Sequence, residues 1–145
     1  MKKRSQLMVL LVICLTASIV AYANDSITGL PVYPGIGSPE PLPKATFCGK
    51  QMDGSFYIVM NGKGEKVTLV AAWYTKHLTS FHVYHANTDG RTQETFFNKD
   101  GTKEVTITSS RGNENEVFSV SYGNFHPGLS LQEMASFNQG KRSCH

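Results

Sequence analysis

Histidines are the side chains of this sequence best suited to bind a metal or to transfer protons. The closest pair, His82 and His85, lies in the run H-V-Y-H, which is rich in residues typical of a β-strand. Residues three apart on a strand point to opposite faces, so these two imidazoles cannot easily share one ion. His77 and His126 are isolated, and His145 ends the sequence. We therefore predict no metal site and no cofactor.

Motifs of known enzyme classes are missing from the sequence. It contains no G-x-S-x-G, no H-E-x-x-H and no glycine-rich phosphate loop. A Ser-His-Asp set could be assembled from distant parts of any chain of this length, but no local motif positions a nucleophile. We predict that the protein is not an enzyme; a hydrolase of unrecognised type is the least supported alternative.

The first 23 residues have the pattern of a secretory signal peptide. A basic start, Lys2–Arg4, precedes an apolar run at Leu7–Val20, and Ala21-Tyr22-Ala23 places small residues at the positions that signal peptidase prefers. The apolar run is short for a spanning helix, although a retained anchor is the alternative. We predict cleavage after Ala23 and export to the periplasm or the medium.

The positive charge of the chain belongs to this signal. The 145 residues carry 14 Lys and Arg against 11 Asp and Glu, a formal charge of +3, and Lys2, Lys3 and Arg4 account for the whole excess. Without them the net charge is about zero, which argues against nucleic acid and against an anionic membrane as partners, since both favour a basic surface. We expect no membrane insertion after cleavage and predict a protein partner.

Two cysteines remain once the signal is removed. Cys48 and Cys144 form an even pair in an oxidising compartment, which favours one disulfide. It would close nearly the whole domain, a loop for which chain entropy predicts a stabilisation on the order of 4–5 kcal/mol. Two thiols or half of a metal site are the alternatives.

Residues 24–44 differ in composition from the rest. This segment holds five of the six prolines, interleaved with glycines. Such a segment does not pair regularly in a sheet and does not continue a helix, so we predict an extended leader or linker, either a spacer or a docking segment for a partner. We expect one folded domain over 45–145.

Short β segments separated by turns fill that domain. The strands that we predict are 45–48, 55–60, 65–73, 80–85, 95–98, 103–108 and 116–122. This spacing is typical of a mainly β fold, and we predict a small antiparallel β-barrel or sandwich of about seven or eight strands. One short helix is expected at Leu131–Phe137, because Ser130 and Glu133 have capping-box spacing.

Aromatic residues on these strands suggest a binding surface. Tyr74, Tyr84 and the pair Phe96-Phe97 cannot all face inward, because neighbouring strand residues alternate. Trp73 is expected in the core. We predict that Tyr74 and Tyr84 contribute to a recognition surface.

Several short motifs between residues 46 and 107 occur in a recognisable order. They are T-F-C at 46–48, G-x-K-V-x-L at 64–69, the run 80–84 beginning with serine, T-D-G at 88–90, and a stretch from Phe97 to Ile107. In this order they resemble the periplasmic and membrane-bound inhibitors of C-type lysozyme. The chain departs from the family at Phe81, which replaces a loop glycine, at the inserted Asp100, and by continuing over residues 108–145.

The resemblance implies a small antiparallel barrel whose first strand and C-terminus share a disulfide, which fits Cys48 and Cys144. It also implies a role for Ser80 as a hydroxyl donor and for Lys99 as a cation, both directed at the catalytic carboxylates in the lysozyme cleft. We therefore predict an exported binding protein, specifically a lysozyme inhibitor. The alternative is a small β binding or adhesion module, or an accessory part of a surface or secretion apparatus, without inhibitory activity.

Overall fold

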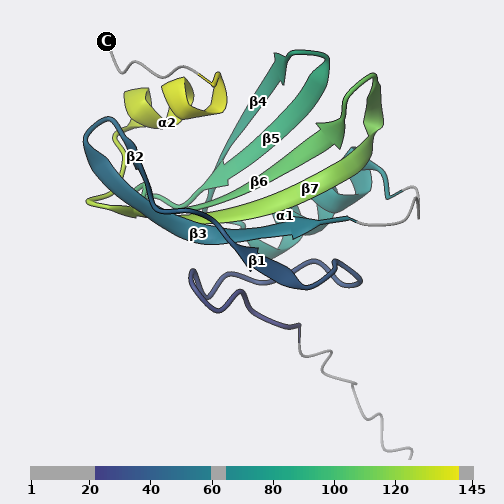
Figure 1. Ribbon diagram of the computed structural model, residues 1–145, viewed down its shortest axis with the longest axis horizontal. Coiled ribbons are helices and arrows are strands. Elements are labelled where there is room, and N and C mark those ends of the chain that lie inside the picture. Colours follow the sequence, from purple (N-terminus) through teal and green to yellow (C-terminus); the bar gives the residue numbers. More distant parts are fainter. Residues whose placement is uncertain (1–21, 60–64, 141–145) are drawn as a thin grey trace, which may run out of the picture.

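An antiparallel sheet of seven strands organises the part of the chain that the structure describes. The structure is a computed structural model that describes residues 22–59 and 65–140. The strands run in the order β1-β3-β7-β6-β5-β4, and β2 also pairs with β3 (Figure 1). Their bounds are β1 Pro39–Pro41, β2 Ala45–Phe47, β3 Lys50–Ile58, β4 His82–Thr88, β5 Arg91–Phe97, β6 Lys103–Ser110 and β7 Asn113–His126; the helices are α1 Val67–His77 and α2 Leu131–Asn138.

The sheet is open, so the mainly β prediction is confirmed but the barrel or sandwich is not. Within residues 22–59 and 65–140, β4 pairs only with β5, and at the other side β1 and β2 each pair only with β3. No second sheet is present among the described residues. Helices and the N-terminal segment cover the two faces instead, so the buried side chains need no closure of the sheet on itself.

The strand predicted at 65–73 is wrong, because α1 occupies this region. Val67, Val70, Ala71 and Tyr74 are buried, and their spacing is that of one helix face. The hairpin turn that the sequence N-G-K-G predicts at 61–64 lies outside the described residues. The same apolar residues are compatible with a period of two. The sheet selects the helix because only a helix places Val67 and Val70, three residues apart, on the same buried face.

The C-terminal helix is confirmed. α2 begins after Ser130, whose hydroxyl accepts a hydrogen bond from the Glu133 backbone N–H, while the Glu133 carboxylate accepts one from the Ser130 N–H. Lys50 Nζ on β3 also donates to the Glu133 carboxylate. The predicted capping box therefore starts the helix and ties it to the sheet.

The segment 24–44 is not an extended linker. Leu30 and Val32 are buried in the main apolar core, and Pro39–Pro41 pair with β3 as an edge strand. Proline is tolerated at such an edge, because it needs no N–H donor on its outer side. The Asp25 carboxylate accepts hydrogen bonds from the backbone and hydroxyl of Thr28, which folds residues 25–28 into a compact turn.

Two apolar cores lie on opposite faces of the sheet. Phe96 belongs to the core formed with α1 and the N-terminal segment, whereas Phe97 belongs to the core under α2. Figure 1 shows α2 above one end of the curved sheet, with α1 and the N-terminal segment on the other side. The two rings point to opposite faces, as strand alternation requires, but both are fully buried, so neither of them contributes to an exposed surface.

Some predictions fall on residues that the structure does not describe. Residues 1–21 hold most of the predicted signal peptide, and residues 141–145 hold Cys144. In the described ranges, no helix has the length and apolar character needed to cross a membrane.

Candidate functional site

The residues singled out by the family resemblance lie at one end of the β4–β5 hairpin. β4 begins two residues after Ser80, and β5 ends two residues before Lys99. His82 pairs with Phe97 at this end of the ladder. The fold therefore brings Ser80 and Lys99 to the same end of these two strands, and both residues are exposed.

At this end of the strands, the side chain of Lys99 is exposed and can contact a partner. It forms no ion pair within 4.0 Å with any described residue. The neighbouring carboxylate of Asp100 instead accepts hydrogen bonds from the Thr102 hydroxyl at 2.6 Å and the Thr102 backbone N–H at 3.1 Å. These bonds lower the pKa of Asp100, so this inserted residue stays ionised and shapes the turn.

The two tyrosines predicted for recognition have different places. Tyr84 on β4 is half-buried, with its ring 6.0 Å from that of Phe97 and its hydroxyl 4.0 Å from Met134 Sδ, so it borders the core under α2. Tyr74 is fully buried on α1, and the structure contradicts its assignment to a surface. Its hydroxyl bonds to that of Tyr122 and accepts from the Tyr33 backbone N–H. Tyr74 is a core residue.

The histidines do not converge. His82 and His85 on β4 are both exposed, and Nδ1 of His85 lies 3.6 Å from a carboxylate oxygen of Glu94. The described residues contain no cluster of three or more His, Cys, Asp or Glu side chains arranged to hold a metal.

The predicted disulfide is only half within the described region. Cys48 follows β2 with a φ of +53°, whereas Cys144 lies outside the described residues. The preceding residue, Phe47, packs its ring edge-on against Phe137 of α2 at 5.1 Å. The end of α2 is therefore close to the β2–β3 hairpin, and the pairing stays a prediction that this arrangement favours.

A polar groove that the sequence reasoning missed lies where the β2–β3 hairpin meets the end of β7. Its volume is about 440 Å³, and its lining residues are Lys44, Ala45, Thr46, Gln51, Met52, Asp53 and His126. The sequence does not reveal the groove locally. Gly49–Gly54 is predicted as a turn, whereas β3 runs through residues 50–54, and His126 is distant in sequence. Polar residues alternating along 44–46 and 51–53 were the only signal.

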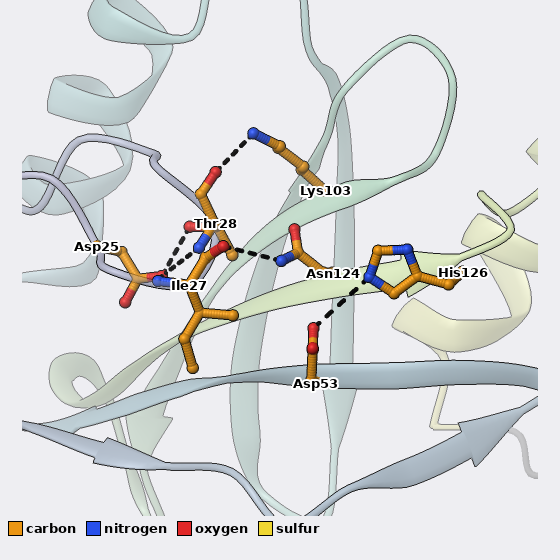
Figure 2. A network of polar contacts seen from close by, with 7 residues as sticks. All are labelled: Asp25, Ile27, Thr28, Asp53, Lys103, Asn124 and His126. Atoms are coloured by element: carbon orange, nitrogen blue, oxygen red, sulfur yellow. Dashed lines mark hydrogen bonds and ion pairs between the residues drawn. The ribbon is translucent and has the colours of Figure 1, made fainter.

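A network of hydrogen bonds beside this groove holds the N-terminal turn on the sheet (Figure 2). Lys103 Nζ donates to the Thr28 carbonyl at 2.6 Å, and Asn124 Nδ2 donates to the Ile27 carbonyl at 2.9 Å. Burial acts to raise the pKa of Asp25, but hydrogen bonds from Thr28, Ser55 and Tyr57 outweigh it and lower the pKa. The turn is thus centred on an ionised, buried carboxylate.

A second buried carboxylate lies on the opposite face of the sheet. Glu104 on β6 is fully buried, and its Oε1 receives no hydrogen bond from any described residue. Burial raises its pKa to about 8, although a hydrogen bond with Thr106 opposes the shift. Oxygen contacts continue from Glu104 through Thr106 and Thr95 to Asn138 of α2, at 2.6, 3.0 and 2.8 Å.

Comparison with known proteins gives no relative on which to base a function. No family model, curated protein or solved structure matches this chain.

Proposed function

We propose that the protein is an exported binding protein that presents the Ser80–Lys99 end of its sheet to an acidic site on a protein partner. The cleft of a C-type lysozyme is the specific target suggested by the sequence resemblance. The observation that carries the proposal is the placement of Ser80 and Lys99, both exposed, at one end of the β4–β5 hairpin.

The chemistry of these two side chains suits a lysozyme cleft. A lysozyme works with one protonated and one ionised carboxyl group. A serine hydroxyl can donate to either form, and a lysine ammonium pairs with the ionised one. Because Lys99 forms no ion pair with the described residues, it needs to break none to reach such a site. Occupying the cleft would exclude the polysaccharide.

The proposal does not depend on a closed barrel. The resemblance covers residues 46–107, and α1 replaces a strand within this range. What the binding needs is the β4–β5 hairpin and the turns at its end, which a rigid sheet supports: β5 is paired on both sides, with β4 and with β6. Binding residues carried on loops next to a rigid scaffold are common.

The test is inhibition of lysozyme-driven lysis of bacterial cells by the purified protein and its variants. We expect Ser80→Ala and Lys99→Ala each to weaken inhibition by about tenfold, the loss of one charge-assisted hydrogen bond, with an unchanged melting temperature. Lys76→Ala, an exposed lysine on α1, is the matched control and should inhibit like the wild type. Absence of inhibition by the wild type at a large molar excess would refute the proposal.

A second candidate function is a non-inhibitory binding or adhesion module. It is favoured by β4, an edge strand that contains no proline and no lysine and whose register with β5 is regular over its full length. Such an edge can accept a strand from another protein. Val83→Pro should then abolish capture of a partner, whereas equal capture by the wild type and by Val83→Pro would exclude strand addition at β4.

A further inference from the structure

The polar groove beside the β2–β3 hairpin has the size and composition of a small-ligand site. Its volume of about 440 Å³ lies within the range of sites for small molecules. It is built from β2, β3 and the end of β7, and neither Ser80 nor Lys99 lines it. The groove is therefore independent of the surface proposed above for a protein partner.

A carboxylate that accepts no hydrogen bond from the described residues lies in this groove. Asp53 on β3 pairs in register with Asn124 on β7, and its Oδ1 lies 3.8 Å from His126 Nε2, beyond hydrogen-bond distance. Figure 2 shows the two side chains directed toward each other across the strands. Oδ1 is buried and receives no hydrogen bond from the described residues, yet the side chain as a whole is 46% exposed. The rest of the carboxylate is thus open to a donor from outside.

A cation lines the same groove without pairing with this carboxylate. Lys44 precedes Ala45, which pairs with Met52, and Asp53 follows Met52, so Lys44 and Asp53 are neighbours across the hairpin. Lys44 is exposed and forms no ion pair within 4.0 Å with the described residues. The groove therefore offers one negative and one positive group whose charged atoms are more than 4.0 Å apart.

We propose that this groove binds a small zwitterion of about the size of a dipeptide, with its ammonium group on Asp53 and its carboxylate on Lys44. A ligand of one charge sign would meet a like charge at one end of the groove. A zwitterion gives each protein charge an opposite partner and forms a charge-assisted hydrogen bond at both ends. Thr46 and Gln51 line the groove between the hairpin strands and supply donors and acceptors for the peptide group of such a ligand.

The dipeptide L-alanyl-L-alanine is a direct probe. The protein expressed from the full sequence is titrated while backbone amide shifts are followed by NMR at pH 7. We expect saturable shifts at Gln51, Met52, Asp53 and His126 and a Kd on the order of 1 mM. N-acetylated dipeptide, which lacks the ammonium, and dipeptide amide, which lacks the carboxylate, should each bind at least about tenfold more weakly because each loses one charge-assisted contact.

Two variants test the protein side of the same contacts. Asp53→Asn and Lys44→Met should each weaken dipeptide binding at least about tenfold. Asp89→Asn in the exposed β4–β5 turn and Lys76→Met at an exposed position on α1 should bind the dipeptide like the wild type. Absence of shifts at about 10 mM dipeptide, or equal binding of the blocked dipeptides, would overturn the proposal. Failure here leaves lysozyme inhibition by Ser80 and Lys99 untouched, and the inhibition assay on Asp53→Asn separates the two sites.

Discussion

Glu104 allows the sharpest test of the structure, because its protonation determines whether its hydrogen-bond chain can form. Thr106 and Thr95 each have one hydroxyl proton, and the chain of oxygen contacts runs from Glu104 to the Oδ1 of Asn138. If Glu104 is neutral, it donates to Thr106, which donates to Thr95, which donates to Asn138. If Glu104 is ionised, Thr106 must donate to it and Thr95 cannot serve both remaining acceptors. The proton count therefore favours neutral Glu104.

The protonation of Glu104 determines how the free energy of unfolding depends on pH. The pKa of Glu104 is raised from an ordinary 4.5 to about 8 in the folded protein. Below pH 4.5 both the folded and the unfolded state carry the proton, so Glu104 does not make the free energy of unfolding depend on pH. Between pH 4.5 and 8 only the folded state keeps it, and stability falls as pH rises. Above pH 8 the loss is complete, on the order of 5 kcal/mol at 1.36 kcal/mol for each unit of pKa difference.

Glu104→Gln isolates this effect. The amide has nearly the shape of the neutral acid, can donate to Thr106 and does not titrate. We expect the free energies of unfolding of variant and wild type to agree within about 1 kcal/mol at pH 4 and to diverge by roughly 3 kcal/mol at pH 7, with the variant more stable. Urea unfolding followed by tryptophan fluorescence at several pH values measures the difference, and Trp73 on α1 is the only tryptophan.

The matched control is Glu40→Gln, the same change at an exposed position on β1. Its difference from the wild type should stay small and flat over the same pH range. If the difference in free energy of unfolding between Glu104→Gln and the wild type is equally independent of pH between pH 5 and 8, Glu104 is ionised in the folded protein. The Asn138 amide would then have to point its nitrogen toward Thr95, and the proton count above would be wrong.

Three further predictions concern the fold. Ser130→Ala removes the hydroxyl cap of α2 and should lower the free energy of unfolding by about 1 kcal/mol; an unchanged value would mean that α2 does not need this cap. Gly54→Ala would place a Cβ against the carbonyl oxygen of Tyr122 on the neighbouring strand, and we expect a loss of about 3 kcal/mol in a denaturant titration, whereas a neutral effect would contradict the β3–β7 register. Ala72→Gly, at an exposed position in the middle of α1, should lower the free energy of unfolding by about 1 kcal/mol and reduce the helical signal in circular dichroism. If both quantities stay unchanged, residues 67–77 do not form a helix.

The sequence predicted well those elements whose pattern is decided locally. β6 alternates apolar Val105 and Ile107 with polar neighbours, and α2 carries its own capping box, so both were found with nearly correct bounds. α1 could not be predicted this way, because residues 67–74 fit both periods. Leu69 shows which period the fold selects: a strand would bury it with Val67, but it is 58% exposed. Packing against the sheet determines that this segment is a helix, and the local sequence carries no information about that packing.

The same distinction applies to the candidate sites. Ser80 and Lys99 flank a hairpin, so their proximity follows from local pairing once β4 and β5 are recognised. The groove requires β7 to lie beside β3, and this long-range pairing brings His126 to Asp53. No periodicity in the sequence specifies which strands become neighbours, so such a site is found only when the topology is known.

The N-terminal turn restricts where the predicted signal peptide can be removed. Asp25 is 1% exposed and accepts hydrogen bonds from the Thr28 backbone at 2.8 Å and from Tyr57 at 3.1 Å, so a cut beyond it would remove a buried anchor of the segment that covers the core. A cut after Ala23 loses much less: the bond from the Val32 N–H to the Ala23 carbonyl and the ring contacts of Tyr22 with Trp73 and His77. The position chosen from the small residues at Ala21 and Ala23 therefore leaves the Asp25 turn whole, so cleavage at the bond that signal peptidase prefers is compatible with the packing of this segment.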